Sequence, residues 1–145
     1  MAKKMSITFD GFNDLAYAID EAGGDLRAAV NEALTETQGI IENYVLDASV
    51  PYAHGGLKGY AKGDMFDAII TDAQIEWSGN VATVQSGFGL MRKGGWHSIF
   101  VMYGTPKMAK DQKVYNAIRG TKVRKAIAEA QQRIMSERLK LAKGD

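Results

Sequence analysis

The fold is decided by residues 25–49, whose sequence is DLRAAVNEALTETQGIIENYVLDAS. Apolar side chains recur there at spacings of three and four, which predicts one long amphipathic helix. Asp25 is a suitable N-cap, and the helix is expected to end between Asp47 and Ser49, because Pro51 disfavours helical geometry in the residue before it. The apolar stripe of this helix comprises Leu26, Val30, Ala33, Leu34, Thr37, Ile41, Tyr44, Val45 and Ala48.

Helices are also expected on both sides of this stretch. A short one with apolar residues on one side precedes it and is broken by Gly23-Gly24. Residues 114–141, in the last third of the chain, show helical spacing again. Gly120-Thr121 is expected to kink or split that segment, because glycine inside a helix costs about 1 kcal/mol relative to alanine.

Between the long helices the pattern changes several times. Residues 50–64 hold four glycines without an apolar period and predict a long loop. Around Ser78-Gly79-Asn80, β-prone residues between positions 69 and 86 predict two strands joined by a tight turn, an antiparallel hairpin. A second glycine-rich stretch, residues 87–95, then leads into a short apolar segment, residues 99–103.

These elements predict an α+β fold in a single domain that covers residues 1–145. A long N-terminal helix and a C-terminal helix are expected to pack on a small antiparallel β-sheet, with long glycine-rich loops between the elements. The length of 145 residues and the 46% hydrophobic composition suffice for one core.

The sequence shows no pattern typical of catalysis or of metal or cofactor binding. Cysteine is absent, and His54 and His97 lie apart, without the spaced histidines and carboxylates of a metal site. The glycine-rich run 55–63 lacks the order of a phosphate-binding loop, and no serine lies in a Gly-x-Ser-x-Gly turn. The start of the chain lacks the apolar run of a signal peptide, and no stretch approaches the length of a membrane span. We therefore expect no enzyme, no metal, no cofactor and no membrane contact.

Charge is divided unevenly along the chain, although the net charge is only +1. Residues 1–105 hold seven basic and thirteen acidic residues, a net of −6, whereas residues 106–145 hold eleven and four, a net of +7. Such a split suits subunits that pack acidic face to basic face, or a basic segment that meets nucleic acid; ordinary solvated helix faces are an equal alternative. If subunits meet in this way, raising the salt concentration weakens their association.

Aromatic residues outside the long helices are expected mostly in the core or on the face of the sheet. Trp96 is the exception, because it follows Gly94-Gly95 at a predicted loop tip and exposed aromatic residues are enriched at interfaces. Tyr52 and Tyr60, in the first long loop, are the other candidate subunit-interface residues. The group expected to be buried includes Trp77, Phe88 and Phe100.

Basic residues in the last third are candidates to face a DNA channel or a partner. Each lysine or arginine that neutralises a phosphate adds a salt-dependent, sequence-independent attraction. No DNA-reading motif is present, so loose contact with DNA that passes through a pore is favoured over specific binding. The candidates are Lys107, Lys110, Lys113 and Arg119, followed by Lys122, Arg124 and Lys125.

Three motifs resemble those of a family of siphophage tail-component proteins. Residues 98–108, SIFVMYGTPKM, resemble its signature, in which an aromatic or aliphatic run leads into a Gly-Thr pair and a Lys-Met-like stretch. Residues 63–69, GDMFDAI, are similar to the family's step from the loop into the hairpin, and residues 7–15, ITFDGFNDL, to its opening. The family usually has glutamate where this chain has Met102, and a shorter loop than residues 50–64. The motif residues are Gly63, Met65, Ile69, Phe100, Tyr103, Gly104 and Thr105.

The resemblance implies a non-enzymatic structural subunit of a tailed-phage virion. It implies a neck, head–tail joining or tail-completion protein, akin to the minor tail protein Z of phage lambda, which is made in the host cytoplasm and forms a ring around the DNA channel. Its partners would be copies of itself, head-completion proteins and tail-tube or terminator proteins, with passive contact with DNA. Alternatives are a tail terminator or head-closure subunit, a non-specific DNA-binding module and, without any supporting feature, an enzyme.

Overall fold

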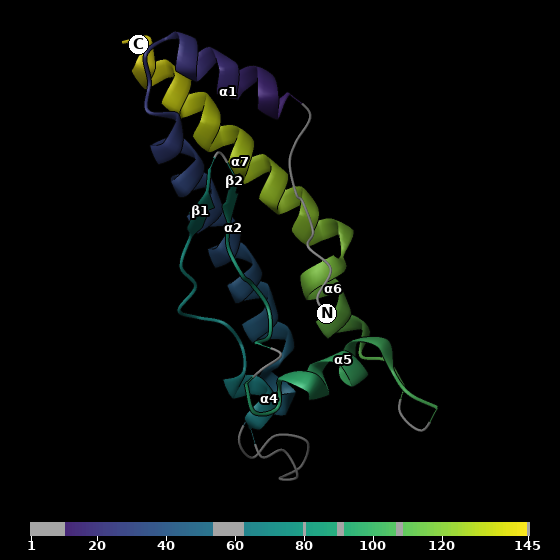
Figure 1. The fold of residues 1–145 in the computed structure, drawn as a ribbon. Helices are drawn as coiled ribbons and strands as arrows, with labels where there is room; N and C mark the ends of the chain where they lie inside the picture. The colour runs from purple at the N-terminus through teal and green to yellow at the C-terminus, as the bar shows by residue number, and fades with distance from the viewer. Residues whose placement is uncertain (1–10, 54–62, 80, 90–91, 107–108, 145) are drawn as a thin grey trace.

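Two long antiparallel helices run along most of the molecule and pack against each other. A computed structural model describes residues 11–53, 63–79, 81–89, 92–106 and 109–144. Helices α2 (Leu26–Ala48) and α7 (Thr121–Ala142) lie side by side along its length, and α1 (Phe12–Glu21) packs beside the C-terminal end of α7 (Figure 1). The α1 helix and the end of α7 thus occupy one end of the molecule.

The other elements are short. They are a 3₁₀ turn η1 (Val50–Tyr52), helix α4 (Asp64–Asp67), strands β1 (Glu76–Ser78) and β2 (Val81–Thr83), and helices α5 (Gly95–Tyr103) and α6 (Gln112–Arg119). Helices α4 and α5 lie at the end opposite α1, and α6 leads from that end into α7 (Figure 1). The described residues hold no helix long and apolar enough to cross a lipid bilayer.

The long second helix begins and ends as its sequence predicts. The Asp25 side chain accepts a hydrogen bond of 3.0 Å from the Ala28 amide, which satisfies one of the free donors of the first turn. At the other end Ser49 is the C-cap, two residues before Pro51. The prediction of a long helix from Asp25 to about Ser49 is therefore confirmed.

The predicted break at Gly120 is also confirmed. Gly120 has φ −74° and ψ 158°, an extended conformation that separates α6 from α7. A β-carbon on this glycine would lie 2.5 Å from the carbonyl oxygen of Asn116, so a side chain at position 120 would collide with the end of α6. Asp111 caps the start of α6 by accepting from the amides of Lys113 and Val114.

The core is built mainly by helix packing on helix. Apolar residues of α2, α6 and α7 meet those of α4, α5 and Phe88 in the larger cluster of buried side chains. A smaller cluster of Ile19, Ala29 and Met135 fixes α1 against α2 and α7. The larger cluster comprises Ile41, Val45, Ala48, Met65, Ile69, Phe88, Val101, Met102, Val114, Ala117, Val123 and Ile127.

Two buried glutamine side chains connect α2 to its neighbours. Gln131 of α7 donates to the Thr37 hydroxyl across the α2–α7 interface at 2.9 Å, and Thr37 in turn donates to the Ala33 carbonyl. Gln38 donates to the Ile70 carbonyl at 3.2 Å and accepts from Ser86 at 2.6 Å. Because a buried polar group without a partner is costly, these bonds fix the register of α2 against α7 and of the extended segments against α2.

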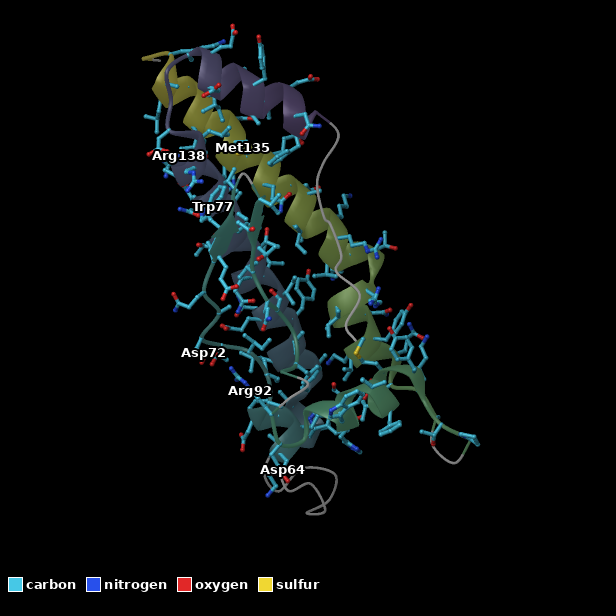
Figure 2. The ribbon with its side chains drawn as sticks, viewed as in Figure 1. Asp64, Asp72, Trp77, Arg92, Met135 and Arg138 are labelled. Carbon is cyan, nitrogen blue, oxygen red and sulfur yellow. The ribbon has the colours of Figure 1, made fainter. Side chains whose placement is uncertain are left out.

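The predicted antiparallel hairpin is present, with Trp77 paired to Ala82 and Gly79 at its turn. The Trp77 indole donates to the Asn31 side chain at 2.8 Å, and the Arg27 guanidinium lies 4.4 Å from the centre of the indole ring and donates to the Gly79 carbonyl. These contacts attach the hairpin to the N-terminal half of α2 (Figure 2).

The α+β class is confirmed, but several details differ from the expectation. The long helix is the second element rather than the first, and the long helices pack chiefly on each other, because strands of three residues each cover little surface. Ile69 lies outside the strands and forms a single bridge with Phe88. Residues 95–103, expected as part of a loop and a short apolar segment, form helix α5.

Candidate interaction surface

Helix α5 divides its side chains into two faces. Gly95, Ser98, Val101 and Met102 are buried against the rest of the molecule. Trp96, Phe100 and Tyr103 follow one another at helical spacings of four and three, so they lie on one face. Their exposed fractions are 57%, 48% and 51%. We call these three residues the α5 aromatic face.

Backbone contacts hold α5 rigidly in place. Gly94, the N-cap, has φ +82°, and a β-carbon there would lie 2.6 Å from the Asp64 carbonyl oxygen, so only glycine permits α5 to start this close to α4. Within α5, the Ser98 hydroxyl donates to the Gly95 carbonyl at 2.6 Å. At the other end the Asp111 amide donates to the Val101 carbonyl at 2.7 Å. The α5 aromatic face is therefore presented by a fixed scaffold.

Ion pairs surround the start of α5. The Arg92 guanidinium contacts the Asp72 carboxylate at 2.8 Å, which lowers the pKa of Asp72 through the hydrogen bond from Arg92 (Figure 2). The Lys93 ammonium lies 3.7 Å from the Asp64 carboxylate. These exposed pairs contribute little to stability individually, but they neutralise the charges beside α5.

The α5 aromatic face continues onto α6. The rings of Tyr103 and Tyr115 meet edge to face with centroids 5.7 Å apart, and the Lys110 ammonium lies 3.8 Å above the Tyr115 ring. A cation over an aromatic ring is held by the ring's quadrupole while its outer side stays in water. The surface thus combines three exposed aromatic rings with a positive charge at its edge.

Three large aromatic residues exposed on one short helix are unusual for a surface that faces only water. Single exposed apolar residues are common, but contiguous groups of them indicate binding surfaces. Tryptophan and tyrosine are enriched at interfaces because they bury a large area with few rotatable bonds. The α5 aromatic face is therefore the best candidate for a contact with another protein surface.

The residues of the family motifs separate into two groups. Met65 and Ile69 are buried at 4% and 3% exposure, and Gly63 and Gly104 have positive φ values of 87° and 77° at the ends of α4 and α5. These four residues shape the scaffold. Phe100 and Tyr103 instead reach solvent, so the prediction that Phe100 is buried was wrong, and Thr105 is half-buried just after α5.

The candidate interface residues have different environments. Trp96 lies in the first turn of α5 rather than at a loop tip. Tyr52 is half-buried and its hydroxyl donates to the Asp111 carboxylate at 2.7 Å, which connects η1 to the start of α6. Burial, then the hydrogen bond and the charge of Asp111, raise the pKa of Tyr52. Tyr60 falls outside the described residues, as does His54, while His97 is exposed on α5.

The basic residues proposed for a DNA channel do not form one patch. Lys110 is over Tyr115, the Lys113 ammonium is 3.8 Å from Asp47, and Arg119 is half-buried with its Nε hidden from solvent. Lys107 is outside the described residues. Lys122, Arg124 and Lys125 are exposed at the start of α7.

The acidic long helix and the basic C-terminal helix pair with each other inside the chain. Arg138 of α7 binds Glu32 of α2, and Arg133 lies 3.8 Å from Glu36. Together with the pair of Lys113 and Asp47, three basic residues of the last third thus lie beside carboxylates of α2 within the folded chain. That subunits pack acidic face to basic face stays a prediction, and these pairs leave fewer charges of α2 and α7 for such a contact.

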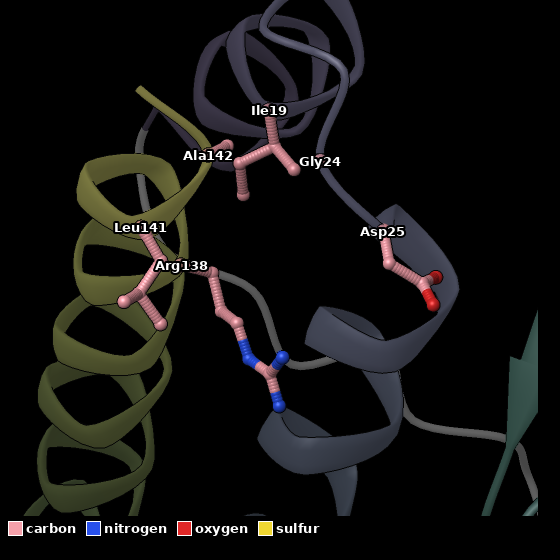
Figure 3. A pocket seen from close by; sticks show the side chains of 6 residues that line it. All are labelled: Ile19, Gly24, Asp25, Arg138, Leu141 and Ala142. Atoms are coloured by element: carbon pink, nitrogen blue, oxygen red, sulfur yellow. The ribbon is translucent and has the colours of Figure 1, made fainter. Parts of the chain in front are cut away.

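Two cavities lie on the surface of the described residues, and neither is lined by a cluster of ionisable side chains. One, of about 210 Å³, lies at the turn between α1 and α2 (Figure 3). Of its two charged residues, Asp25 caps α2 and Arg138 forms an ion pair with Glu32. The other, of about 340 Å³, lies between the hairpin and α2. Across the described ranges no cluster of three or more histidine, aspartate or glutamate side chains is arranged to hold a metal. The first cavity is lined by Ile19, Gly24, Asp25, Arg138, Leu141 and Ala142.

Comparison with protein-family models, curated proteins and solved structures finds no match to this chain. The resemblance to siphophage tail components therefore rests on the three sequence motifs.

The sequence contained a signal for the α5 aromatic face that was missed. Gly94 and Gly104 are ten residues apart and mark the start and the end of a helix, and the aromatic residues between them occupy positions i, i+4 and i+7. The β-prone composition of residues 99–103 concealed this period. The contact between Tyr103 and Tyr115 depends on tertiary packing and carried no sequence signal.

Proposed function

We propose that this protein is a structural subunit of a tailed-phage virion that assembles with copies of itself, as a ring, at the head–tail joint. The observation that carries the proposal is the α5 aromatic face, because Phe100 and Tyr103, two aromatic residues of the motif at residues 98–108, are exposed. A motif whose aromatic residues face solvent fits a contact surface better than a core.

The rigidity of the scaffold supports the same role. Association is weakened when loops and side chains must be ordered on binding. The α5 helix is positioned by the close approach of Gly94 to α4 and by the hydrogen bond from Asp111 to Val101, so its backbone needs little further ordering on binding. A preorganised surface suits a subunit that joins a fixed assembly.

Non-specific DNA binding is less well supported. Lys113, Arg133 and Arg138 lie beside carboxylates of α2, so fewer cations remain to displace counterions from DNA. Filter binding of duplex DNA to the isolated protein at moderate salt distinguishes the two functions. The structural role predicts weak or no retention, and tight retention would favour the DNA-binding module.

The virion provides the direct test. Purified particles of the phage that encodes this chain should contain it in a few copies, located at the head–tail joint by immunogold electron microscopy. Deletion of the gene should give filled heads and free tails, and a plasmid copy should restore joined particles. Virions that lack the polypeptide, or a deletion strain with normally attached tails, would contradict the proposal. The same deletions distinguish a neck ring, a head-closure subunit and a tail terminator. When the genes of neighbouring virion proteins are deleted, these three kinds of subunit differ in whether they stay attached to free heads or to free tails.

A further inference from the structure

A second distinctive surface lies on α1, at the end of the molecule opposite α5 (Figure 1). The buried side of α1 consists of Ile19 with Phe12, Leu15 and Ala16 packed around it. Asp14, Tyr17, Asp20 and Glu21 are exposed, and Tyr17 is 67% exposed. We call these four residues the α1 acidic face. The helix has three acidic residues and no basic one.

The carboxylates of the α1 acidic face differ from those of α2 in their ion pairs. In the described part of the chain, no ion pair includes Asp14, Asp20 or Glu21, whereas Glu32 and Glu36 of α2 are paired with α7. The Tyr17 hydroxyl interacts with two of these carboxylates. Its pKa is raised mainly by a hydrogen bond to Glu21, and to a smaller extent by desolvation and by the charge of Asp20. The result is a negative surface with one exposed aromatic ring.

The opposite end has the complementary character. Neither α5, GWHSIFVMY, nor α6, QKVYNAIR, contains an acidic residue. Asp111 between them is already bonded to Tyr52 and to the first amides of α6. The Lys110 ammonium lies over the Tyr115 ring, beside the α5 aromatic face, and Lys113 is exposed on α6, 3.8 Å from the equally exposed Asp47 carboxylate, a solvent-exposed pair that a second carboxylate can replace. This end therefore presents aromatic rings beside positive charge.

We infer that the α1 acidic face of one copy docks on the α5 aromatic face of the next copy. The two surfaces lie at opposite ends of one chain and cannot meet within it (Figure 1). A contact between two different surfaces of identical chains is head to tail, and it gives a ring where its rotation closes and an open filament where it does not. The inference rests on the proposed self-assembly and specifies which surfaces carry it. Aspartate and glutamate meet Lys110 and Lys113, and Tyr17 packs among Trp96, Phe100 and Tyr103.

Zero-length cross-linking tests the contact directly. A carbodiimide joins a carboxylate to an amine only when the two are in contact. In an equimolar mixture of ¹⁴N- and ¹⁵N-labelled protein, peptides that join Asp20 or Glu21 to Lys110 or Lys113 should appear with mixed labels, which proves that they come from two chains. High salt should reduce their yield, because the paired charges are exposed. Mixed-label dimers cross-linked only through other residues would overturn the inference.

Charge exchange provides the second test, by sedimentation velocity. We expect D20K/E21K and K110E/K113E each to weaken association at least tenfold and the fourfold variant to restore it, because every junction then regains opposite charges. Lysine is favourable at the end of α1, and glutamate just before and in the first turn of α6. Because K110E/K113E also removes the contacts of Lys110 with Tyr115 and of Lys113 with Asp47, circular dichroism must first show that this variant is folded. E129K, an exposed charge reversal midway along α7, is the matched control and should associate as the wild type does.

The outcomes separate this inference from the proposed function. One outcome is that the wild type assembles, that Trp96→Ala abolishes this assembly, and that D20K/E21K leaves it unchanged. In that case the α5 aromatic face is an interface, but α1 is not its partner. If the wild type shows no association at any concentration and no mixed-label cross-link, both the inference and the proposed self-assembly fail.

Discussion

The α2–α7 pair and the α4–α5 end use apolar residues in opposite ways. Along α2 and α7, the apolar stripes face each other, and Val45, Ile127 and Ile134 are at most 2% exposed. On α5 the smaller residues are buried, whereas the three aromatic residues face outward. Both regions show helical periodicity, so periodicity alone does not tell whether an apolar stripe is buried within the chain. Burial depends on whether a partner element exists in the same chain.

The comparison predicts that stability resides in the α2–α7 pair and association in the α4–α5 end. The substitutions below test this division, and they are ordered by the expected loss in the free energy of unfolding.

Removing a side chain from the larger core cluster should have the greatest effect. Ile127 of α7 is 1% exposed and belongs to the larger core cluster, to which α2 and α6 also contribute. We expect Ile127→Ala to lower the free energy of unfolding by about 2–5 kcal/mol, because it leaves a cavity in a packed core. Urea denaturation followed by circular dichroism measures this loss. Val81→Ala, at a residue that is 62% exposed, should cost less than about 0.5 kcal/mol. Equal losses for both variants would contradict the assigned core.

The junction of α4 and α5 should give the next largest effect. Gly94→Ala combines an unfavourable positive φ with a collision against the backbone of Asp64 and Met65, and we expect a loss of roughly 1–3 kcal/mol. Gly11 has φ +91° with no atom near its β-carbon position, so Gly11→Ala isolates the cost of the positive φ alone. If both variants lose the same free energy in urea titrations, α5 does not approach α4 as closely as described.

The hydrogen bond between Tyr52 and Asp111 should contribute less. We expect Tyr52→Phe to cost about 1 kcal/mol at pH 8. Because the pKa of Tyr52 is raised above its ordinary value of 10.0 in the folded chain, the folded state binds this proton more tightly than the unfolded chain does. The contribution is therefore complete below pH 10 and is lost as the pH rises further. The difference in stability between wild type and variant should shrink from pH 8 to pH 11, and a growing difference would refute this assignment.

Parts of this structure could be predicted from sequence because their signals are local. The long α2 helix follows from the spacing of its apolar residues and from the Asp25 cap. The split at Gly120 follows from the low helix propensity of glycine, and the hairpin follows from the turn at Gly79. Each of these depends on a few neighbouring residues whose preferences agree with the fold.

The rest depends on tertiary contacts that the sequence does not display. Ile99, Phe100 and Val101 favour strands, yet they form a helix, because Gly94 fits against α4 and Val101 and Met102 are buried in the core. The charge division suggested contacts between subunits, but Arg133 and Arg138 pair with α2 of their own chain. Which charges remain free, as on α1, is known only once the helices are packed.

The largest change in association should come from half-exposed residues whose removal leaves the chain folded. Trp96 and Phe100 are 57% and 48% exposed, so the double variant Trp96→Ala/Phe100→Ala should lose less free energy of unfolding than Ile127→Ala does. Sedimentation velocity over a hundredfold range of protein concentration tests the central claim. The wild type should shift from monomer to a larger species, while the variant should remain monomeric throughout. An unchanged concentration dependence in the folded variant would contradict the assignment of the α5 aromatic face as an interface between subunits.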